Sequence, residues 1–540
     1  MKMASLLNGG HGDMKDKKED KSTFNLKSEH SFDLSSIGQY HFYLSQLEED
    51  KYLDHRVIND LDVNNFFKFI DRTYSAVGQQ YLYNRILSVE SFKDSFDLLE
   101  EDVAYYAEKP ERKEESQKIL QKLTKSTDYY FPYLIFSELP KKVSYLTGIK
   151  ILQVLVFVLS AISFFYHFMV FPLIAVLVIN MGIHYMHKNK IGNFIQYFYR
   201  LNILTKCSRK LLPISKNPKS PIIKKIKQVE KLSTSISFLK TDSLQESEIG
   251  SVIWVLIELL KVATLGEITL FYKITDHIAE HREDIHGLYK FIGGIDIAIS
   301  IGLLRFSLPY YSTPKFDENK KEFQVAELYH PLIPGCVAND LKLKDKSLML
   351  TGSNMSGKST FIKSVGLNAI ASQTFNTSFT KEYLAPTFRL LTSMKISDDI
   401  QESKSYYLDE VVTVGDMIEK SEDENARYLF IIDEIFKGTN TIERISGGKA
   451  ILSYLNRGKH LVLIATHDIE LTNLLGEEYD LYYFQEKVDD NSLAFDYQIK
   501  KGRIKNFNAI KIMEISGYPA SIVQDARALA RKMEEEKNRR

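Results

Sequence analysis

Residues 352–359 read GSNMSGKS, a glycine-rich loop that fits the pattern G-x-x-x-x-G-K-[ST]. The apolar run Leu348–Leu350 precedes the loop and the helical pattern FIKSVGLNAIA follows it, so the sequence predicts a strand, a loop and a helix in that order. In this arrangement backbone amides turn toward phosphate oxygens, and the positive end of the helix points to the same place. The motif therefore predicts a nucleotide-binding site.

Individual side chains of the loop have distinct expected roles. Lys358 supplies a positive charge for the outer phosphates of ATP, and the hydroxyl of Ser359 suits Mg²⁺. ATP and Mg²⁺ are the cofactors that the sequence predicts. The loop residues expected to contact the nucleotide are Gly352, Ser353, Asn354, Met355, Ser356, Gly357, Lys358, Ser359 and Thr360.

Two further apolar runs end in groups that suit phosphate chemistry. Residues 429–434 read LFIIDE, where Asp433 can hold Mg²⁺ with Ser359, and Glu434 can orient or deprotonate a water molecule. Leu461–Ala465 is another predicted strand, and His467 behind it can polarise the γ-phosphate region. Three such strand ends in this order indicate a Mg²⁺-dependent ATPase with Glu434 and His467 as catalytic candidates.

From about Phe323 onward, short apolar runs alternate with helical segments and glycine turns. This rhythm predicts an α/β P-loop NTPase domain of the ABC type with a parallel-rich sheet. The preceding residues show apolar spacings of three and four, which predicts an all-α region.

The stretch from Ile151 to His187 contains no Asp, Glu, Lys or Arg. A bilayer core needs about 20 apolar residues per helix, so the stretch is long enough for two spans. Lysines flank it on both sides, which favours two cytoplasmic ends. We expect a transmembrane helical hairpin that contacts lipid through residues 149–187, in the inner or cytoplasmic membrane. A buried hairpin in a soluble domain and a single span are the alternatives.

For several neighbouring segments, a purely structural interpretation stands beside a functional one. Val252–Ile274 is apolar but contains charged residues such as Glu258, Lys261 and Glu267, which favours a core helix of the soluble part. His277 and His281 lie four residues apart, and a solvated helix face is favoured over a metal site. A lysine-rich segment at 206–227 is a solvated surface, a lipid contact or a DNA contact.

Composition sets limits on location and partners. Lys plus Arg and Asp plus Glu both number 70, so the net charge gives no global attraction to nucleic acid. The two cysteines are far apart in sequence, which favours a reducing compartment.

The quoted segments resemble the MutS family of DNA mismatch-repair ATPases. The matching text is HPLIPGCVANDLKLKDKSLMLTGSNMSGKSTF, then DEIFKGTNT, then ATHDIEL. The family motif TGPNMGGKST is met with Ser353 and Ser356 as substitutions. SKSYYLDE is similar to a family signature in which a serine reaches the γ-phosphate of the neighbouring subunit. The resemblance thus implies a homodimer with composite ATP sites and Ser405 acting in trans.

The rest of the chain resembles the family less closely. FKFIDRTYSAVGQQYLYNRIL is similar to the start of the family's core domain, and the end of the chain to its helix–turn–helix dimerisation element, with Gly517 in the turn. The family's aromatic residue that stacks on adenine is missing near Cys336. The region expected for a mismatch-reading domain is a short polar tail, and Phe136-Ser137-Glu138 fits the reading tripeptide by chance. Direct mismatch reading is therefore not expected, although DNA stays a candidate partner.

These observations predict six segments. They are a flexible polar tail (1–31), a helical region (32–146), the hairpin (147–190), a helical core and lever region (191–322), the ATPase domain (323–490), and a last strand with the dimerisation element (491–540). The expected function is a membrane-anchored, DNA-associated ATPase that switches conformation with ATP. A membrane mechanochemical ATPase acting on a protein or lipid, and a nucleotide-gated scaffold, are the alternatives.

Overall fold

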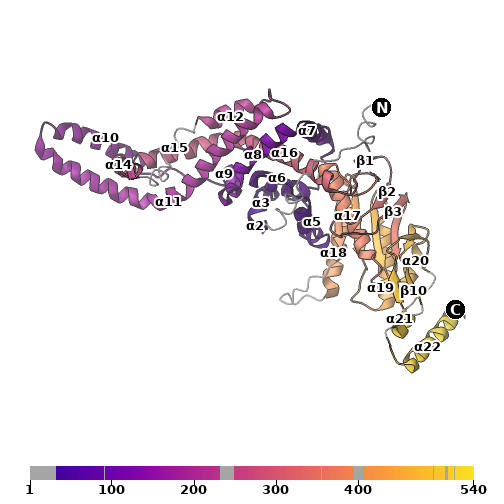
Figure 1. The fold of residues 1–540 in the computed structure, drawn as a ribbon. Helices are drawn as coiled ribbons and strands as arrows, with labels where there is room; N and C mark the ends of the chain where they lie inside the picture. The colour runs from indigo at the N-terminus through magenta and orange to yellow at the C-terminus, as the bar shows by residue number, and fades with distance from the viewer. Residues whose placement is uncertain are drawn as a thin grey trace.

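The computed structural model describes residues 32–89, 92–231, 248–353, 355–394, 406–489, 492–504, 509–515 and 517–539. Among the described residues, helices make up the part from Leu34 to Ser307, and an α/β part follows it (Figure 1). A pair of long helices projects from the helical part on the side away from the α/β part (Figure 1). The polar tail expected at 1–31 lies outside the described residues.

The N-terminal helical block is built from short amphipathic helices. In α5 (Val63–Ile70), the residues Val63, Phe66, Phe67 and Ile70 recur at helical spacing and are fully buried. The other helices of the block are α2 (Leu34–Ile37), α3 (Gln39–Leu47), α4 (His55–Asp60), α6 (Ala76–Leu87), α7 (Phe96–Glu108), α8 (Pro110–Leu120) and α9 (Phe131–Phe136).

The long helix α16 (Arg282–Ser307) is the central element of the helical part, and α6 and α7 pack along it. Asp296 of α16 accepts hydrogen bonds from the backbone N–H groups of Tyr74 and Ser75, at 2.8 Å each. These bonds satisfy free amides at the start of α6, where a carboxylate also complements the helix dipole.

The projecting pair consists of α10 (Leu146–Ser163) and α11 (Val170–Leu211), joined through the 3₁₀ turn His167–Met169. Apolar side chains cover its outside; Phe157, Phe165 and Phe171, for example, are 62%, 75% and 77% exposed. Pro172 lies in the first turn of α11, where its missing N–H has no helical partner to lose. The boundary expected at residue 190 falls inside α11, which continues into the helical block.

Three helical segments of the described chain are long and apolar enough to cross a membrane. Leu146–Ser163 and His167–Lys188 are 11% and 17% buried over their most apolar windows. The third, Arg282–Ser307, is 67% buried, and it forms the core of the helical part as α16.

The expected single core helix at Val252–Ile274 is wrong. The chain forms α14 (Glu248–Thr264) and α15 (Gly266–Glu280), which are separated at Leu265 by a left-handed backbone conformation (φ 49°). Only α15 is a core helix, with five apolar or aromatic side chains buried among its neighbours; α14 leaves one face exposed.

Part of the lysine-rich segment serves internal contacts, because Arg209 pairs with Glu230, and Lys216 with Glu101. Lys225, on α12 (Ile222–Glu230), donates to the carbonyl of Glu283 at 3.2 Å.

The α/β part is organised by a six-stranded sheet in the order β12-β9-β4-β8-β7-β6. Every pair in it is parallel except β12 with β9. The strands are β4 (Ser347–Thr351), β6 (Arg389–Ser393), β7 (Tyr428–Asp433), β8 (Leu461–Thr466), β9 (Tyr479–Tyr483) and β12 (Lys500–Lys501).

Both faces of this sheet are covered, which explains the continuous apolar runs of β4, β7 and β8. Leu348 and Leu350 face a core shared with α17 (Lys358–Phe375) and the helical part, whereas Met349 faces a core shared with α19 (Thr441–Leu455). The remaining helices of this part are α18 (Tyr406–Ser421) and α20 (Ile469–Leu475).

A second sheet and the C-terminal elements complete the chain. The sheet has the order β1-β5-β2-β3, with β1 (Lys315–Phe316), β2 (Glu322–Leu328), β3 (Asn339–Lys344) and β5 (Glu382–Ala385). The boundary expected at 490/491 falls between the paired strands β10 (Glu486–Asp489) and β11 (Ser492–Phe495). Helices α21 (Ala509–Ile515) and α22 (Ala520–Arg539) end the chain, with Gly517 in the turn at φ 80°.

Candidate nucleotide site

The loop between β4 and α17 lies at the carboxyl end of the parallel strands. Gly352 and Gly357 adopt positive φ angles of 145° and 104°, backbone conformations that residues with a Cβ atom rarely adopt. Lys358 is the first residue of α17 and is buried, and its ammonium donates to the carbonyls of Gly352 (2.6 Å) and Ser353 (2.9 Å). The loop and the helix start therefore form a concave surface with a cation at its centre.

Burial lowers the pKa of Lys358 from its usual value, and the nearby Asp433, Glu434 and Glu486 carboxylates oppose this shift. The ammonium is therefore held charged by acidic neighbours, in a place where water contributes little.

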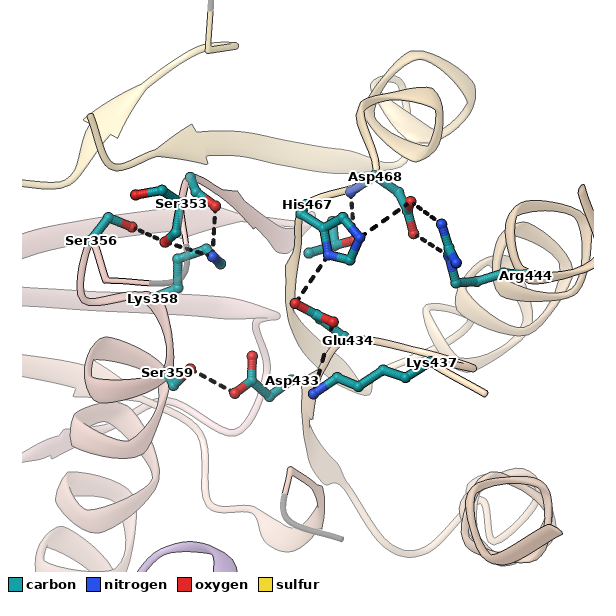
Figure 2. Close-up of polar contacts among 12 residues, drawn as sticks. Ser353, Ser356, Lys358, Ser359, Asp433, Glu434, Lys437, Arg444, His467 and Asp468 are labelled. Carbon is teal, nitrogen blue, oxygen red and sulfur yellow. Dashed lines mark hydrogen bonds and ion pairs between the residues drawn. The ribbon is translucent and has the colours of Figure 1, made fainter. Parts of the chain in front are cut away.

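The ends of β4 and β7 come together because only β8 lies between them in the sheet. Ser359 on α17 donates its hydroxyl hydrogen to Asp433 Oδ2 at 2.6 Å (Figure 2). A hydroxyl and a carboxylate at this separation are hard oxygen donors of the kind that Mg²⁺ prefers.

Glu434 follows β7 in a left-handed conformation, with φ at 65°. Its amide donates to the carbonyl of Ala465 at 2.8 Å, which links the ends of β7 and β8. A non-glycine residue in this region of the backbone map is strained, and such strain clusters at functional sites. The conformation directs the Glu434 side chain across the strand ends toward His467 (Figure 2).

His467 lies at the end of β8 and is half exposed. Its Nδ1 atom is 3.0 Å from Glu434 Oε1, and its Nε2 atom is 3.9 Å from Asp468 Oδ1. Asp468 is held in turn by two hydrogen bonds of 2.9 Å from Arg444 on α19, and this contact raises the pKa of Arg444. The imidazole thus lies between two carboxylates of fixed position (Figure 2).

A cavity of about 460 Å³ opens beside the loop. Its lining includes the loop residues Met355 and Gly357 to Thr360 and a set of apolar and aromatic side chains: Leu328, Ile333, Cys336, Val337, Phe361, Phe484 and Tyr497. Tyr497 adopts a positive φ of 50°, and its ring stacks on Phe495. An aromatic wall is therefore present although the segment around Cys336 supplies none.

The structure brings together Gly352, Ser353, Ser356, Gly357, Lys358, Ser359, Asp433, Glu434 and His467 at one edge of the sheet. Met355, which is 73% exposed, and Thr360 both line the cavity. Asn354 and Ser405 lie outside the described residues.

Sequence reasoning missed Glu486, whose carboxylate is buried beside the loop. Glu486 Oε2 accepts from Ser353 Oγ at 3.3 Å, and Ser356 Oγ donates to the Ser353 carbonyl at 2.7 Å. Both hydroxyls occur where the quoted family motif has proline and glycine. These two substitutions were therefore the sequence feature that could have indicated an additional polar partner of the loop. The Arg444–Asp468 pair was also missed, because nothing in the spacing of the two residues marks it.

Glu410 ends the SKSYYLDE segment and reaches the same edge from α18. Burial raises its pKa, and Glu410 Oε1 accepts from the backbone N–H of Lys437 at 3.4 Å. The described part of that segment thus lies next to Asp433 and Glu434.

The strand–loop–helix cradle, the acidic end of β7 and the histidine at the end of β8 define a P-loop ATPase domain. Residues 348–534 match the family model described as MutS domain V. The C-terminal part of the chain is thus similar to the ATPase domain of the MutS family.

Curated relatives agree with this assignment. The chain is 31% identical over 274 residues to the DNA mismatch repair protein MutS of Fervidobacterium nodosum. The aligned region covers 49% of this chain and 32% of the relative. The chain is 29% identical over 271 residues to that of Petrotoga mobilis, covering 48% and 33%. Against the Aquifex pyrophilus protein the identity is 26% over 283 residues, covering 51% and 32%. The chain thus spans about a third of the length of these relatives.

Proposed function

We propose that this chain is a membrane-anchored ATPase of the MutS family that binds and hydrolyses ATP with Mg²⁺ to change conformation. The observation that carries the ATPase proposal is the 2.6 Å contact between Ser359 and Asp433, beside a glutamate that a histidine orients. These groups come from three strand ends and meet at the cradle formed by the loop.

The chain's own residues divide the work of hydrolysis. Lys358 and the amides of the loop bind the β- and γ-phosphates and stabilise the charge that develops on them. Glu434 accepts a hydrogen bond from a water molecule and orients it toward the γ-phosphorus, and it can take up the proton that the water loses. His467, 3.0 Å from Glu434, fixes the direction of that carboxylate.

Ser359 and Asp433 fit Mg²⁺, because they offer a hydroxyl and a carboxylate oxygen side by side. When bound, the ion neutralises negative charge on the phosphate oxygens. The cavity beside the loop fits the nucleoside, with Tyr497 as the aromatic contact for the base.

Two substitutions test the ATPase proposal. Lys358→Ala is expected to abolish nucleotide binding, whereas Glu434→Gln is expected to keep binding and to lower turnover by about 10² to 10⁴. Both are measured with the full chain, by titration with a fluorescent ATP analogue and by phosphate release. Unchanged ATP affinity in Lys358→Ala would contradict the site, and unchanged turnover in Glu434→Gln would contradict the role of the carboxylate.

The anchoring proposal rests on α10 and on residues 170–188 of α11. These helices have the length and hydropathy of bilayer spans and expose most of their apolar surface. Lysines at both ends favour cytoplasmic placement of both soluble parts, at an inner or cytoplasmic membrane. Recovery of the full-length protein in the soluble fraction without detergent would contradict this proposal.

The family suggests a homodimer with composite ATP sites, in which Ser405 acts in trans, and suggests DNA as a partner. The exposed apolar residues Tyr518, in the turn between α21 and α22, and Ile522 and Leu529, on α22, support a helical dimer contact. Turnover measured with duplex, mismatched, branched and no DNA tests the DNA association. Turnover that no DNA changes would favour an ATPase that acts on a protein or lipid instead.

A further inference from the structure

Helix α14 has its two faces reversed relative to a helix of a soluble protein. The face turned away from the protein is aliphatic, with exposed fractions of 43% to 62% for Val252, Ile253, Val255, Leu256, Leu259 and Leu260. The charged residues from Val252 to Thr264 are Glu258 and Lys261, and they point inward with 19% and 5% exposed. In a soluble protein, an amphipathic helix exposes its charged side chains to water and buries its apolar face.

The inward charges of α14 meet partners of opposite sign from α11 and α15. Lys261 Nζ lies 3.6 Å from Glu258 Oε2 and 3.8 Å from Glu267 Oε1. Lys188 Nζ lies 2.9 Å from Glu258 Oε1, and His184 lies between the two glutamates at 3.6 and 3.8 Å. Two lysines and two glutamates around a neutral imidazole sum to zero charge, which is how ionised side chains are tolerated next to hydrocarbon.

At the turn between α14 and α15, several polar groups are also hydrogen-bonded within the protein. Asn180 of α11 donates to the carbonyl of Ala263 at 2.7 Å, and Thr264 Oγ1 donates to the carbonyl of Leu260 at 2.8 Å. The amide of Gly266 donates to Thr264 Oγ1 at 3.2 Å, and Leu265 is fully buried. Irregular backbone within a bilayer is tolerated where its polar groups are satisfied in this way.

The contacts with α11 give the depth of the turn. Asn180 is ten residues from the start of α11, about 15 Å along the helix, and Lys188 is about 12 Å further on. The hydrocarbon core of a bilayer is about 30 Å thick, so the turn lies near the middle of the segment that would span it. Helix α14 runs back from there toward the level of Lys188, beside the projecting pair (Figure 1).

We infer that α14 is a re-entrant helix, which lies in the bilayer leaflet on the side of the soluble parts and turns back at Leu265. The occupant of its aliphatic face is phospholipid acyl chain, because this face continues the lipid-facing surface of α10 and α11. The inference rests on the proposed membrane anchoring and adds a third helix to it. Trp254 lies at about the headgroup level, where tryptophan is enriched.

The chain contains one tryptophan, Trp254, and it lies on α14, so the native protein carries its own probe. The full chain is reconstituted in phosphatidylcholine–phosphatidylglycerol vesicles whose acyl chains carry bromine, a contact quencher, at shallow or deep carbons. We expect loss of most Trp254 emission with shallow bromines and a smaller loss with deep ones. Trp254→Phe combined with Leu260→Trp moves the probe toward Leu265, and deep bromines should then quench more.

Two matched variants make failure of this inference distinguishable from failure of the anchoring. Trp254→Phe with Ile174→Trp reports on α11, and Trp254→Phe with Leu98→Trp places the probe on the exposed face of α7 in the soluble part. Quenching of the Ile174→Trp reporter without quenching of Trp254 overturns the inference and leaves the anchor standing. No quenching of either overturns both. Shielding of Trp254 from bromolipid and from aqueous acrylamide alike also overturns the inference, because protein, such as a second copy, would then cover α14.

Discussion

Replacement of Gly352 by alanine is predicted to weaken ATP binding without unfolding the protein. Gly352 has a φ of 145°, and a Cβ atom there would lie 2.8 Å from the Phe484 carbonyl oxygen and 2.8 Å from Ser356 Oγ. The Phe484 backbone cannot move freely, because its amide is bonded to the Thr351 carbonyl at 2.9 Å. The loop can therefore accept the methyl group only by leaving the geometry that cradles phosphate.

The size of the effect follows from two contributions. An alanine in this glycine-only region of the backbone map is strained by about 1 to 3 kcal/mol. Displacement of the Ser356 hydroxyl also breaks its 2.7 Å bond to the Ser353 carbonyl, which contributes about 1 kcal/mol. Because binding must restore the cradle against this strain, about 2 to 4 kcal/mol is lost, which corresponds to a roughly 30- to 900-fold weaker affinity.

The assay is equilibrium titration of the full chain with a fluorescent ATP analogue in the presence of Mg²⁺. Gly458→Ala is the matched control, because Gly458 also has a positive φ (65°) but has no atom within 4 Å of the added Cβ and lies in the turn before β8. We expect wild-type affinity from the control. Wild-type affinity in Gly352→Ala would refute the reasoning, since the loop would then not need a glycine to hold phosphate.

Three further predictions concern affinity, stability and pH. Tyr497→Ala should weaken ATP binding about fivefold to 100-fold if the ring stacks on the base, and Tyr497→Phe should not, in the same titration. Asp296→Asn should lower the thermal unfolding temperature, because an amide N–H₂ then faces the Ser75 amide and about 1 to 3 kcal/mol is lost. Burial lowers the pKa of His286 to about 4, so the folded state disfavours its protonation; stability should fall as pH decreases from about 6.5 toward 4, and His286→Gln should reduce that slope.

The nucleotide loop could be predicted because its chemistry is local. Eight consecutive residues specify the turn, the cation and the helix start, and the apolar run before them specifies the strand. The position of Asp433 opposite Ser359 could be predicted for a related reason, since the carboxyl ends of parallel strands meet at one edge of a sheet. Neither inference required knowing which segments distant in sequence pack against the loop.

The contacts that were not predicted depend on the packing of segments that are distant in sequence. Glu486 contacts Ser353 only because the segment that follows β9 lies beside the loop. Arg444 contacts Asp468 only because α19 packs next to the end of β8. The continuation of α11 past residue 190 was missed for a different reason. The change from apolar to charged residues there marks a change of surroundings, and the helix itself does not end.

The misassignment of Val252–Ile274 shows what a count of charges leaves out. Charged residues in an apolar stretch argue against contact with lipid only if those residues face outward. Glu258 and Lys261 are three residues apart, so they share one face of α14, and the residues between and around them on the other face are aliphatic. The spacing thus already separated a polar side from an apolar side. It could not say which side faces the protein, because that depends on Lys188, which lies more than 60 residues earlier and supplies the charge opposite to Glu258, and on the neutral His184 beside it.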